Sequence, residues 1–138
     1  MHESAPNAFL SALSARDFGR FAESLAPEAQ ARMLLPRGPE VRSGRQEIAR
    51  RFEGWFSSAS DFEVLDSHRV QVGRRYRLSW RFRLRRDGQS REVIEQVAFV
   101  NAGPNGIHEI DLLCSGFLRE EEVVASSADE AGMSCSAR

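Results

Sequence analysis

Residues 34–56, LLPRGPEVRSGRQEIARRFEGWF, contain a Pro/Gly-rich turn followed by an amphipathic helix. The prolines and glycines interrupt an apolar segment, so a short strand over about 31–35 is expected to end in a turn here. Ser43, with Gln46 three residues later, has the spacing of a capping box and predicts a helix over about 44–56. One face of this helix is apolar and repeats every four residues, through Ile48, Phe52 and Phe56.

The segment before this stretch predicts two more helices. Residues 5–14 have helical apolar spacing, and the inward side chains are expected to be Phe9, Leu10 and Leu13. Asp17 can cap a second helix, and Pro27 is expected to end it, because the residue before a proline avoids the helical region. The apolar face of that second helix consists of Phe18, Phe21, Ala22 and Leu25.

The segment after the stretch is typical of an antiparallel sheet. Apolar and polar residues alternate from Tyr76 to Leu84, as in a strand with one buried face. Asp87-Gly88 and the turn AGPNG at 102–106 separate this strand from later ones. The other strands are expected at about 62–72 (as one or two strands), 91–101 and 107–117. Helices followed by strands predict an α+β fold, with about three helices packed on one face of a curved, mostly antiparallel sheet.

Length and composition favour one globular domain. The 138 residues are enough to bury a sizeable core. We expect the domain to span residues 1–118. Residues 119–138 are acidic at first and then rich in Ser and Ala, without periodicity. This composition predicts a disordered C-terminal tail.

Charge and hydropathy argue against two classes of partner and favour one location. The net charge is −1, so no overall field draws the chain to nucleic acid or to an anionic membrane. No apolar run approaches the ~20 residues of a membrane span. The start, MHESAPNAFL, lacks the basic and then apolar segments of a secretory signal, so a cytoplasmic protein is expected.

The residue types also argue against several cofactors. All 19 basic residues are Arg, which excludes Schiff-base chemistry and a P-loop lysine. No Gly-rich nucleotide motif occurs. The histidines show no HxH or HxxxH spacing, so neither a metal site nor a cofactor is expected.

Three segments in this order resemble the nuclear-transport-factor-2-like superfamily, and most closely its SnoaL-like and ketosteroid-isomerase-like proteins. They are FLSALSARDFGRFAESLAPEA, PEVRSGRQEIARRF and VAFVNAGPNGIHEIDLL, within a matched region of about residues 7–117. The resemblance implies a cone whose interior is an apolar pocket between helices and sheet. It also implies a small hydrophobic ligand and a homodimer formed through the outer face of the sheet.

The catalytic positions of these relatives hold other residue types here. The isomerase base, an Asp before a proline, falls on Leu35, and the two oxyanion donors fall on Phe9 and Gln96. A leucine cannot take a proton and Phe9 has no hydroxyl, so steroid-type enolisation by that set of residues is not expected. The catalytic positions of the epoxide hydrolases and of the SnoaL cyclases fall on Leu112, the Leu78–Trp80 stretch and Ser115.

The same matching assigns a side of the sheet to each strand residue. Besides Gln96, the interior is expected to contain Tyr76, Leu78, Trp80, Phe82, Ile94, Ala98, His108, Ile110, Leu112 and Cys114. The exterior is expected to carry three arginines opposite three acids, namely Arg77, Arg81, Arg83, Glu95, Glu109 and Asp111. Such complementary charges suit a solvated or dimer-forming sheet face.

Three interior residues are candidates for catalysis. His108 has an ordinary pKa near 6.5 and can transfer protons, although it can also be a hydrogen-bonded residue at the end of a strand. Gln96 can polarise a ligand carbonyl or bond to Tyr76 or His108. Cys114 can be a nucleophile or simply a small buried hydrophobe. The expected substrate-binding residues are Phe9, Leu35, Trp55, Tyr76, Trp80, Phe82, Ile110 and Leu112, although aromatics at such spacing can equally be core.

Two functions remain open at this point. One is a cofactor-independent cyclase, isomerase or dehydratase that acts on a hydrophobic polyketide- or terpenoid-like molecule. The other is a non-catalytic ligand-binding or dimeric interaction module that has lost the catalytic carboxylates of its relatives.

Overall fold

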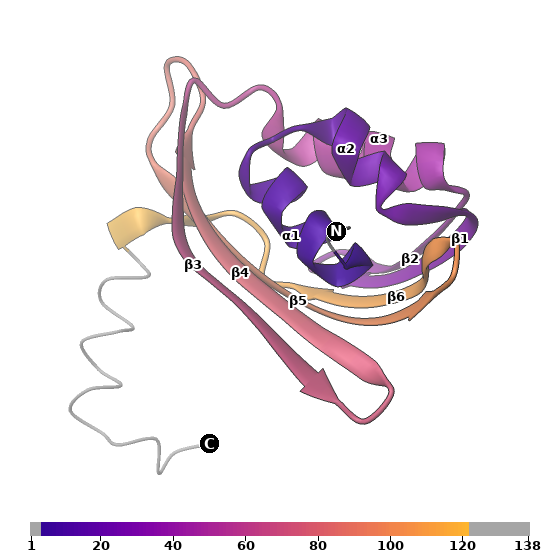
Figure 1. Cartoon of the computed structure of the whole chain (residues 1–138). Helices are drawn as coiled ribbons and strands as arrows, with labels where there is room; N and C mark the ends of the chain where they lie inside the picture. Colours follow the sequence, from indigo (N-terminus) through magenta and orange to yellow (C-terminus); the bar gives the residue numbers. More distant parts are fainter. Residues whose placement is uncertain (1–3, 122–138) are drawn as a thin grey trace, which may run out of the picture.

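The computed structural model describes residues 4–121 and confirms the α+β prediction. The helices are α1 (Ala5–Ser14), α2 (Phe18–Glu23) and α3 (Arg45–Phe56). The strands are β1 (Leu25–Leu35), β2 (Gly38–Ser43), β3 (Asp61–Val72), β4 (Arg75–Arg85), β5 (Glu92–Gly103), β6 (Gly106–Cys114) and β7 (Leu118–Arg119). Figure 1 shows all three helices on the same side of a curved sheet, where they cover its concave face.

The sheet has the strand order β2-β1-β6-β5-β4-β3, and β7 pairs with β5 at the Val93–Leu118 position. All described neighbours are antiparallel except β1 and β6, which run parallel. The last strand of the meander thus returns beside the first strand of the chain. This pairing brings the β1–β2 turn close to the end of β6, where a pocket lies.

The first two helices begin as their sequences predict. Asp17 caps α2, and its side chain accepts a hydrogen bond from the backbone N–H of Arg20 at 3.1 Å. The predicted end of α2 at Pro27 is wrong, because the helix ends at Glu23 and Pro27 lies inside β1. Pro27 has no N–H to contribute, and it lies where the β1–β6 register shifts, so the strand tolerates it.

The predicted capping box at the start of α3 is also wrong. Ser43 belongs to β2, where it pairs with Gln30, and Gly44 takes the cap position without a side-chain bond. Gly44 has φ +93, a left-handed conformation that favours glycine, and its N–H donates to the carbonyl of Ala29 at 2.7 Å. The pairing of β2 with β1, which the turn prediction did not include, therefore sets the start of the helix.

Aromatic side chains fill the space between the helices and the sheet. The ring centroids of Phe9 and Phe21 are 4.6 Å apart, those of Phe21 and Phe52 are 4.8 Å apart, and those of Phe9 and Trp80 are 5.9 Å apart. All four residues are at most 1% exposed. The resemblance implied an apolar pocket in the interior, but at these residues the interior is a packed core. Truncation of one such large buried side chain typically lowers the free energy of unfolding by several kcal/mol.

The side assignments of β4 and β5 agree with the structure, but that of His108 does not. Leu78, Trp80, Phe82, Ile94, Gln96 and Ala98 are all buried. His108 was expected inside and is exposed instead. The register shifts by one residue between the pairs Asn101–Glu109 and Ala102–Ile107, which leaves His108 as the extra residue of a β-bulge and turns Ile107 inward in its place.

The outer face of the sheet carries ion pairs, but among the described residues only one of them joins an arginine and an acid of the predicted set, and Arg83 pairs instead with Glu63 of β3. Arg81 contacts Glu95 at 3.0 Å, and Asp111 accepts from Arg32 at 2.8 Å. The hydrogen bond to Asp111 raises the pKa of Arg32.

The predicted tail begins at 119, yet Arg119 pairs with Glu92 in the sheet, and residues 122–138 lie outside the described part of the chain. None of the helices within residues 4–121 is long and apolar enough to cross a membrane.

Candidate functional site

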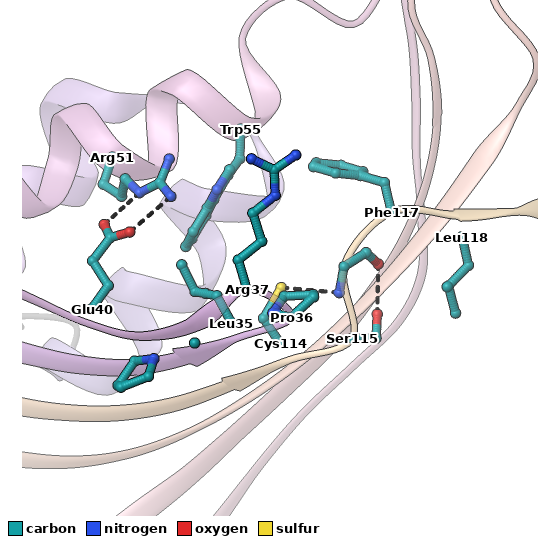
Figure 2. Close-up of a pocket in the computed structure, with 13 residues that line it drawn as sticks. Leu35, Pro36, Arg37, Glu40, Arg51, Trp55, Cys114, Ser115, Phe117 and Leu118 are labelled. Carbon is teal, nitrogen blue, oxygen red and sulfur yellow. Dashed lines mark hydrogen bonds and ion pairs between the residues drawn. The ribbon is translucent and has the colours of Figure 1, made fainter.

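A pocket of about 620 Å³ opens at one end of the sheet, between the β1–β2 turn, α3 and the segment that follows β6. Its size lies within the ~300–1,000 Å³ typical of small-molecule sites. The lining residues, drawn in Figure 2, are Leu35, Pro36, Arg37, Gly38, Pro39, Glu40, Arg51, Trp55, Cys114, Ser115, Gly116, Phe117 and Leu118. Most of this wall is apolar, with a few polar groups placed on it.

The β1–β2 hairpin forms one wall. Leu35 pairs with Gly38, which leaves Pro36 and Arg37 as the two residues of the turn. Gly38 has φ +128, a backbone conformation that residues other than glycine rarely adopt. The tight turn presents Leu35 and Arg37 to the pocket.

Helix α3 forms the opposite wall with an ion pair and an indole ring. Arg51 and Trp55 are four residues apart and therefore share a face of the helix. The Arg51 guanidinium binds both carboxylate oxygens of Glu40, at 2.6 and 3.0 Å, and lies 5.0 Å from the Trp55 ring centroid. The hydrogen bond from Arg51, with a further one from Arg42, lowers the pKa of Glu40. Glu40 is therefore ionised at neutral pH.

The segment after β6 closes the third side. Gly116 has φ +81, and a Cβ placed there would lie 2.7 Å from Cγ of Pro36, so only glycine permits this close approach to the turn. The N–H of Gly116 donates to Sγ of Cys114 at 3.3 Å. Phe117, the next residue, lies under the guanidinium of Arg86 at 4.5 Å.

The structure brings three of the predicted site residues together at this pocket, namely Leu35, Trp55 and Cys114. The other expected binding residues lie in or against the core and outside the lining: Phe9, Tyr76, Trp80, Phe82, Ile110 and Leu112. His108 lies at the bulge, beside Gly103 and on the surface.

Gln96 is buried behind the pocket wall. Its Oε1 accepts from Nε1 of Trp80 at 2.7 Å, and its Nε2 donates to Sγ of Cys114 at 3.3 Å. The predicted alternative partners, Tyr76 and His108, are thus replaced by Trp80 and Cys114. Gln96 links the core to the pocket, but it does not line the pocket.

Among the lining residues that the sequence did not predict, four have charged or aromatic side chains: Arg37, Glu40, Arg51 and Phe117. Two signals were present. Charged residues flank the glycine and proline of the turn in RGPE, and Arg51 is one helical turn before Trp55 on the same face. The contact between Glu40 and Arg51 depends on β2, which the pattern did not predict.

The polar groups that line the pocket suit a small organic molecule rather than a metal ion. No group of three or more His, Cys, Asp or Glu side chains within residues 4–121 is placed to hold a metal. Glu40, the carboxylate among the lining residues of the described chain, is already bound by two guanidinium groups. The arrangement offers apolar surface, one thiol and cationic groups that can bind an oxygen anion.

Comparison with known proteins agrees with this fold. The family model described as "SnoaL-like domain" matches residues 7–103, so the chain belongs to the SnoaL-like domain family of the NTF2-like superfamily. A search of curated protein sequences finds no match.

Solved structures share the fold at low identity. A candidate polyketide cyclase from Xanthomonas campestris pv. campestris has a TM-score of 0.62 and 16% identity, over 88% of this chain and 92% of that chain. A candidate polyketide cyclase from Pseudomonas putida KT2440 has a TM-score of 0.60 and 17% identity, over 80% and 91%. A hypothetical protein from Catenulispora acidiphila with a ketosteroid isomerase-like fold, in complex with trimethylamine, has a TM-score of 0.63 and 10% identity, over 81% and 85%. At these identities the likeness shows the fold alone, and the family supports a small-molecule-binding domain.

Proposed function

We propose that this protein binds a small, largely apolar molecule in the pocket between the β1–β2 turn, α3 and the end of β6. The observation that carries the proposal is the pocket itself, a hollow of about 620 Å³ whose walls include Leu35, Trp55 and Phe117. Apolar and aromatic walls with a few polar groups are the common form of a small-molecule site. Binding stands ahead of catalysis because the lining carboxylate, Glu40, has a lowered pKa and so is a weaker base than an ordinary glutamate.

The neighbouring residues Leu34 and Leu35 allow a matched test, since they face opposite sides of the sheet. Leu35 lines the pocket, whereas Leu34 is 53% exposed and lines a groove on the outer face. The probe is N-phenyl-1-naphthylamine, a neutral dye whose fluorescence increases in apolar sites. We expect Leu35→Asp to weaken dye binding about tenfold or more, because it places a charge in the apolar wall. Leu34→Asp is expected to leave the affinity unchanged.

Two results would contradict this function. One is a dye affinity that is equal in wild type and Leu35→Asp, with circular dichroism showing that both are folded. The other is a loss of binding in Leu34→Asp but not in Leu35→Asp, which would move the site to the outer groove.

A second candidate is a cofactor-independent cyclase, isomerase or dehydratase that acts on a polyketide- or terpenoid-like molecule. The supporting observation is that Glu40 and Cys114 face the same pocket in a domain of the SnoaL-like family. In this scheme the Glu40 carboxylate takes a proton from a carbon between two carbonyls, and Arg37 stabilises the resulting enolate oxygen. The enolate carbon attacks another carbonyl of the same molecule, and Glu40 returns the proton to the alkoxide.

The first step of this scheme is testable with 1-phenylbutane-1,3-dione in deuterated buffer. Nuclear magnetic resonance follows exchange at the carbon between the carbonyls. Catalysis predicts faster exchange with wild type than with Glu40→Gln, whereas the control Glu95→Gln, on the outer face, should behave as wild type. Exchange at the buffer rate with wild type would remove the enzyme candidate.

We also propose that two copies associate through the outer face of the sheet. A groove there is lined by exposed apolar side chains, including Leu34, Val41 and Leu113, each more than half exposed. Burial of such side chains in a dimer would remove them from water. Sedimentation equilibrium should show a dimer for wild type and a monomer for Leu113→Arg, and a wild-type monomer at micromolar concentration would contradict the proposal.

A further inference from the structure

The lining of the pocket contains more positive than negative charge. Arg37 and Arg51 contribute two guanidinium groups, and Glu40 contributes one carboxylate, so the lining has a net charge of +1. The chain as a whole has a net charge of −1. The positive charge of the pocket is therefore local and not a general property of the surface.

Glu40 cannot neutralise both arginines of the lining. Its Oε2 accepts from Nε of Arg51 at 2.6 Å and from Nε of Arg42 at 2.8 Å, and its Oε1 accepts from Nη2 of Arg51 at 3.0 Å. Two guanidinium groups thus share this one carboxylate. Arg37 is left without an acidic partner at the pocket.

Arg37 makes no hydrogen bond, ion pair or ring contact within residues 4–121, and it is exposed. Most of the other described arginines have such a contact, as Arg86 does with Glu92 at 2.9 Å. Figure 2 shows the side chain of Arg37 extending from the turn toward the space between Trp55 and Phe117. An anion can bind this guanidinium without breaking an existing ion pair, and it loses only part of its own hydration there.

The two aromatic walls add to this preference. Arg51 lies 5.0 Å from the ring centroid of Trp55, and Arg86 lies 4.5 Å from that of Phe117. Cations therefore already lie on both rings, so a cationic ligand would meet like charge on each side. A flat apolar body can still contact the rings while its anionic end reaches Arg37.

We propose that the pocket selects small aromatic carboxylates, with Arg37 binding the carboxylate and Trp55 and Phe117 contacting the aromatic body. This inference rests on the binding function proposed above and specifies its ligand class. The guanidinium provides a planar pair of N–H donors that matches the two oxygens of a carboxylate. Because the site is exposed, the interaction is expected to weaken with salt.

Three probes of one shape but different charge test the inference by isothermal titration calorimetry. They are 2-naphthoate, 2-naphthalenemethanol and 2-naphthylmethylammonium. For wild type at low salt, we expect 2-naphthoate to bind about five- to tenfold more tightly than the alcohol, and the ammonium probe to bind most weakly. In Arg37→Met, the advantage of the carboxylate over the alcohol should disappear, while the alcohol binds as in wild type and shows that the pocket is intact.

Arg77→Met is the matched control, because Arg77 lies on the outer face of β4 and also has no side-chain partner among the described residues. It should retain the carboxylate preference. Equal binding of carboxylate and alcohol by wild type, or a preference that survives Arg37→Met, would overturn the inference and leave the binding function standing. Preference for the ammonium probe would also overturn it and would point to Glu40 as the ligand's partner. Failure of all three probes to bind would contradict the binding function itself.

Discussion

At the scale of single residues, two polar side chains near the pocket have different roles. Gln96 is fully buried and joins Trp80 to Cys114, so it supports the wall from behind. Glu40 lies on the pocket surface, where Arg51 holds it. The sequence marked Gln96 correctly as a buried polar residue that needs partners. It could not identify them, because the two partner residues lie on neighbouring strands, 16 and 18 residues away from Gln96 in the chain.

Replacement of Gln96 by leucine tests its structural role. The N–H of Trp80 would lose its acceptor in a dry environment, so Gln96→Leu should lower the free energy of unfolding by about 1–3 kcal/mol. Urea denaturation measures this change. Gln89→Leu, in the exposed β4–β5 loop, is the control and should change stability by no more than about 0.5 kcal/mol. Equal effects of the two substitutions would contradict the role given to Gln96.

Glu40 should make stability depend on pH. Its pKa is lower in the folded chain than the ordinary value of about 4.3, so its contribution is complete above that value and is lost as the pH falls through the folded pKa. We expect Glu40→Gln to cost about 1 kcal/mol at pH 7, and the difference from wild type to shrink as the pH is lowered below about 4. Denaturation at several pH values checks this. A constant difference would show that the ion pair with Arg51 contributes nothing.

At the scale of elements, the helices and the long strands could be predicted, but their boundaries and one register could not. The alternation of apolar and polar residues from Tyr76 to Leu84 is enough to place β4, because the two faces of the strand differ from each other in polarity. Alternation also assumes that no residue is inserted. The bulge at His108 breaks that assumption and turns the predicted acid/base residue outward. Similarly, β2 is short and half-exposed, so its pattern does not differ from that of a loop.

The junction between β1 and β6 gives an element-scale prediction. Gly106 has φ +115, and a Cβ there would lie 2.8 Å from the carbonyl oxygen of Ser24. Gly106→Ala should therefore lower the free energy of unfolding by at least about 2 kcal/mol, because both backbone strain and a steric clash oppose it. Gly54→Ala, in α3 with open space around it, should instead stabilise by about 0.5–1 kcal/mol. Thermal denaturation of both variants checks the contrast, and a tolerated Gly106→Ala would contradict the described pairing.

At the scale of the whole molecule, the curved sheet separates three environments. Its concave face packs against an aromatic core, its end holds the pocket, and its convex face carries ion pairs around an apolar groove. The overall order of elements was predictable from the sequence, since each segment has a distinct periodicity. The place of the pocket was not, because the volume left after packing depends on side-chain sizes from many elements at once.

A packed interior predicts a large cost for truncation of Phe9. In a filled core, Phe9→Ala leaves a cavity beside Phe21 and Trp80 and should lower the free energy of unfolding by about 3–5 kcal/mol. If the interior were instead an open ligand pocket, the loss would be much smaller. Chemical denaturation distinguishes the two, and a cost below about 1 kcal/mol would contradict the packed core.

The central claim, that the ligand site lies at the end of the sheet, is tested most directly by amide chemical-shift mapping with 2-naphthalenemethanol, a neutral probe. We predict that the largest shifts lie in the β1–β2 turn, in α3 and in the segment after β6, at Arg37, Trp55 and Phe117. Shifts confined to the outer groove, at Val41, Val97 and Leu113, or the absence of any saturable shift, would contradict the claim.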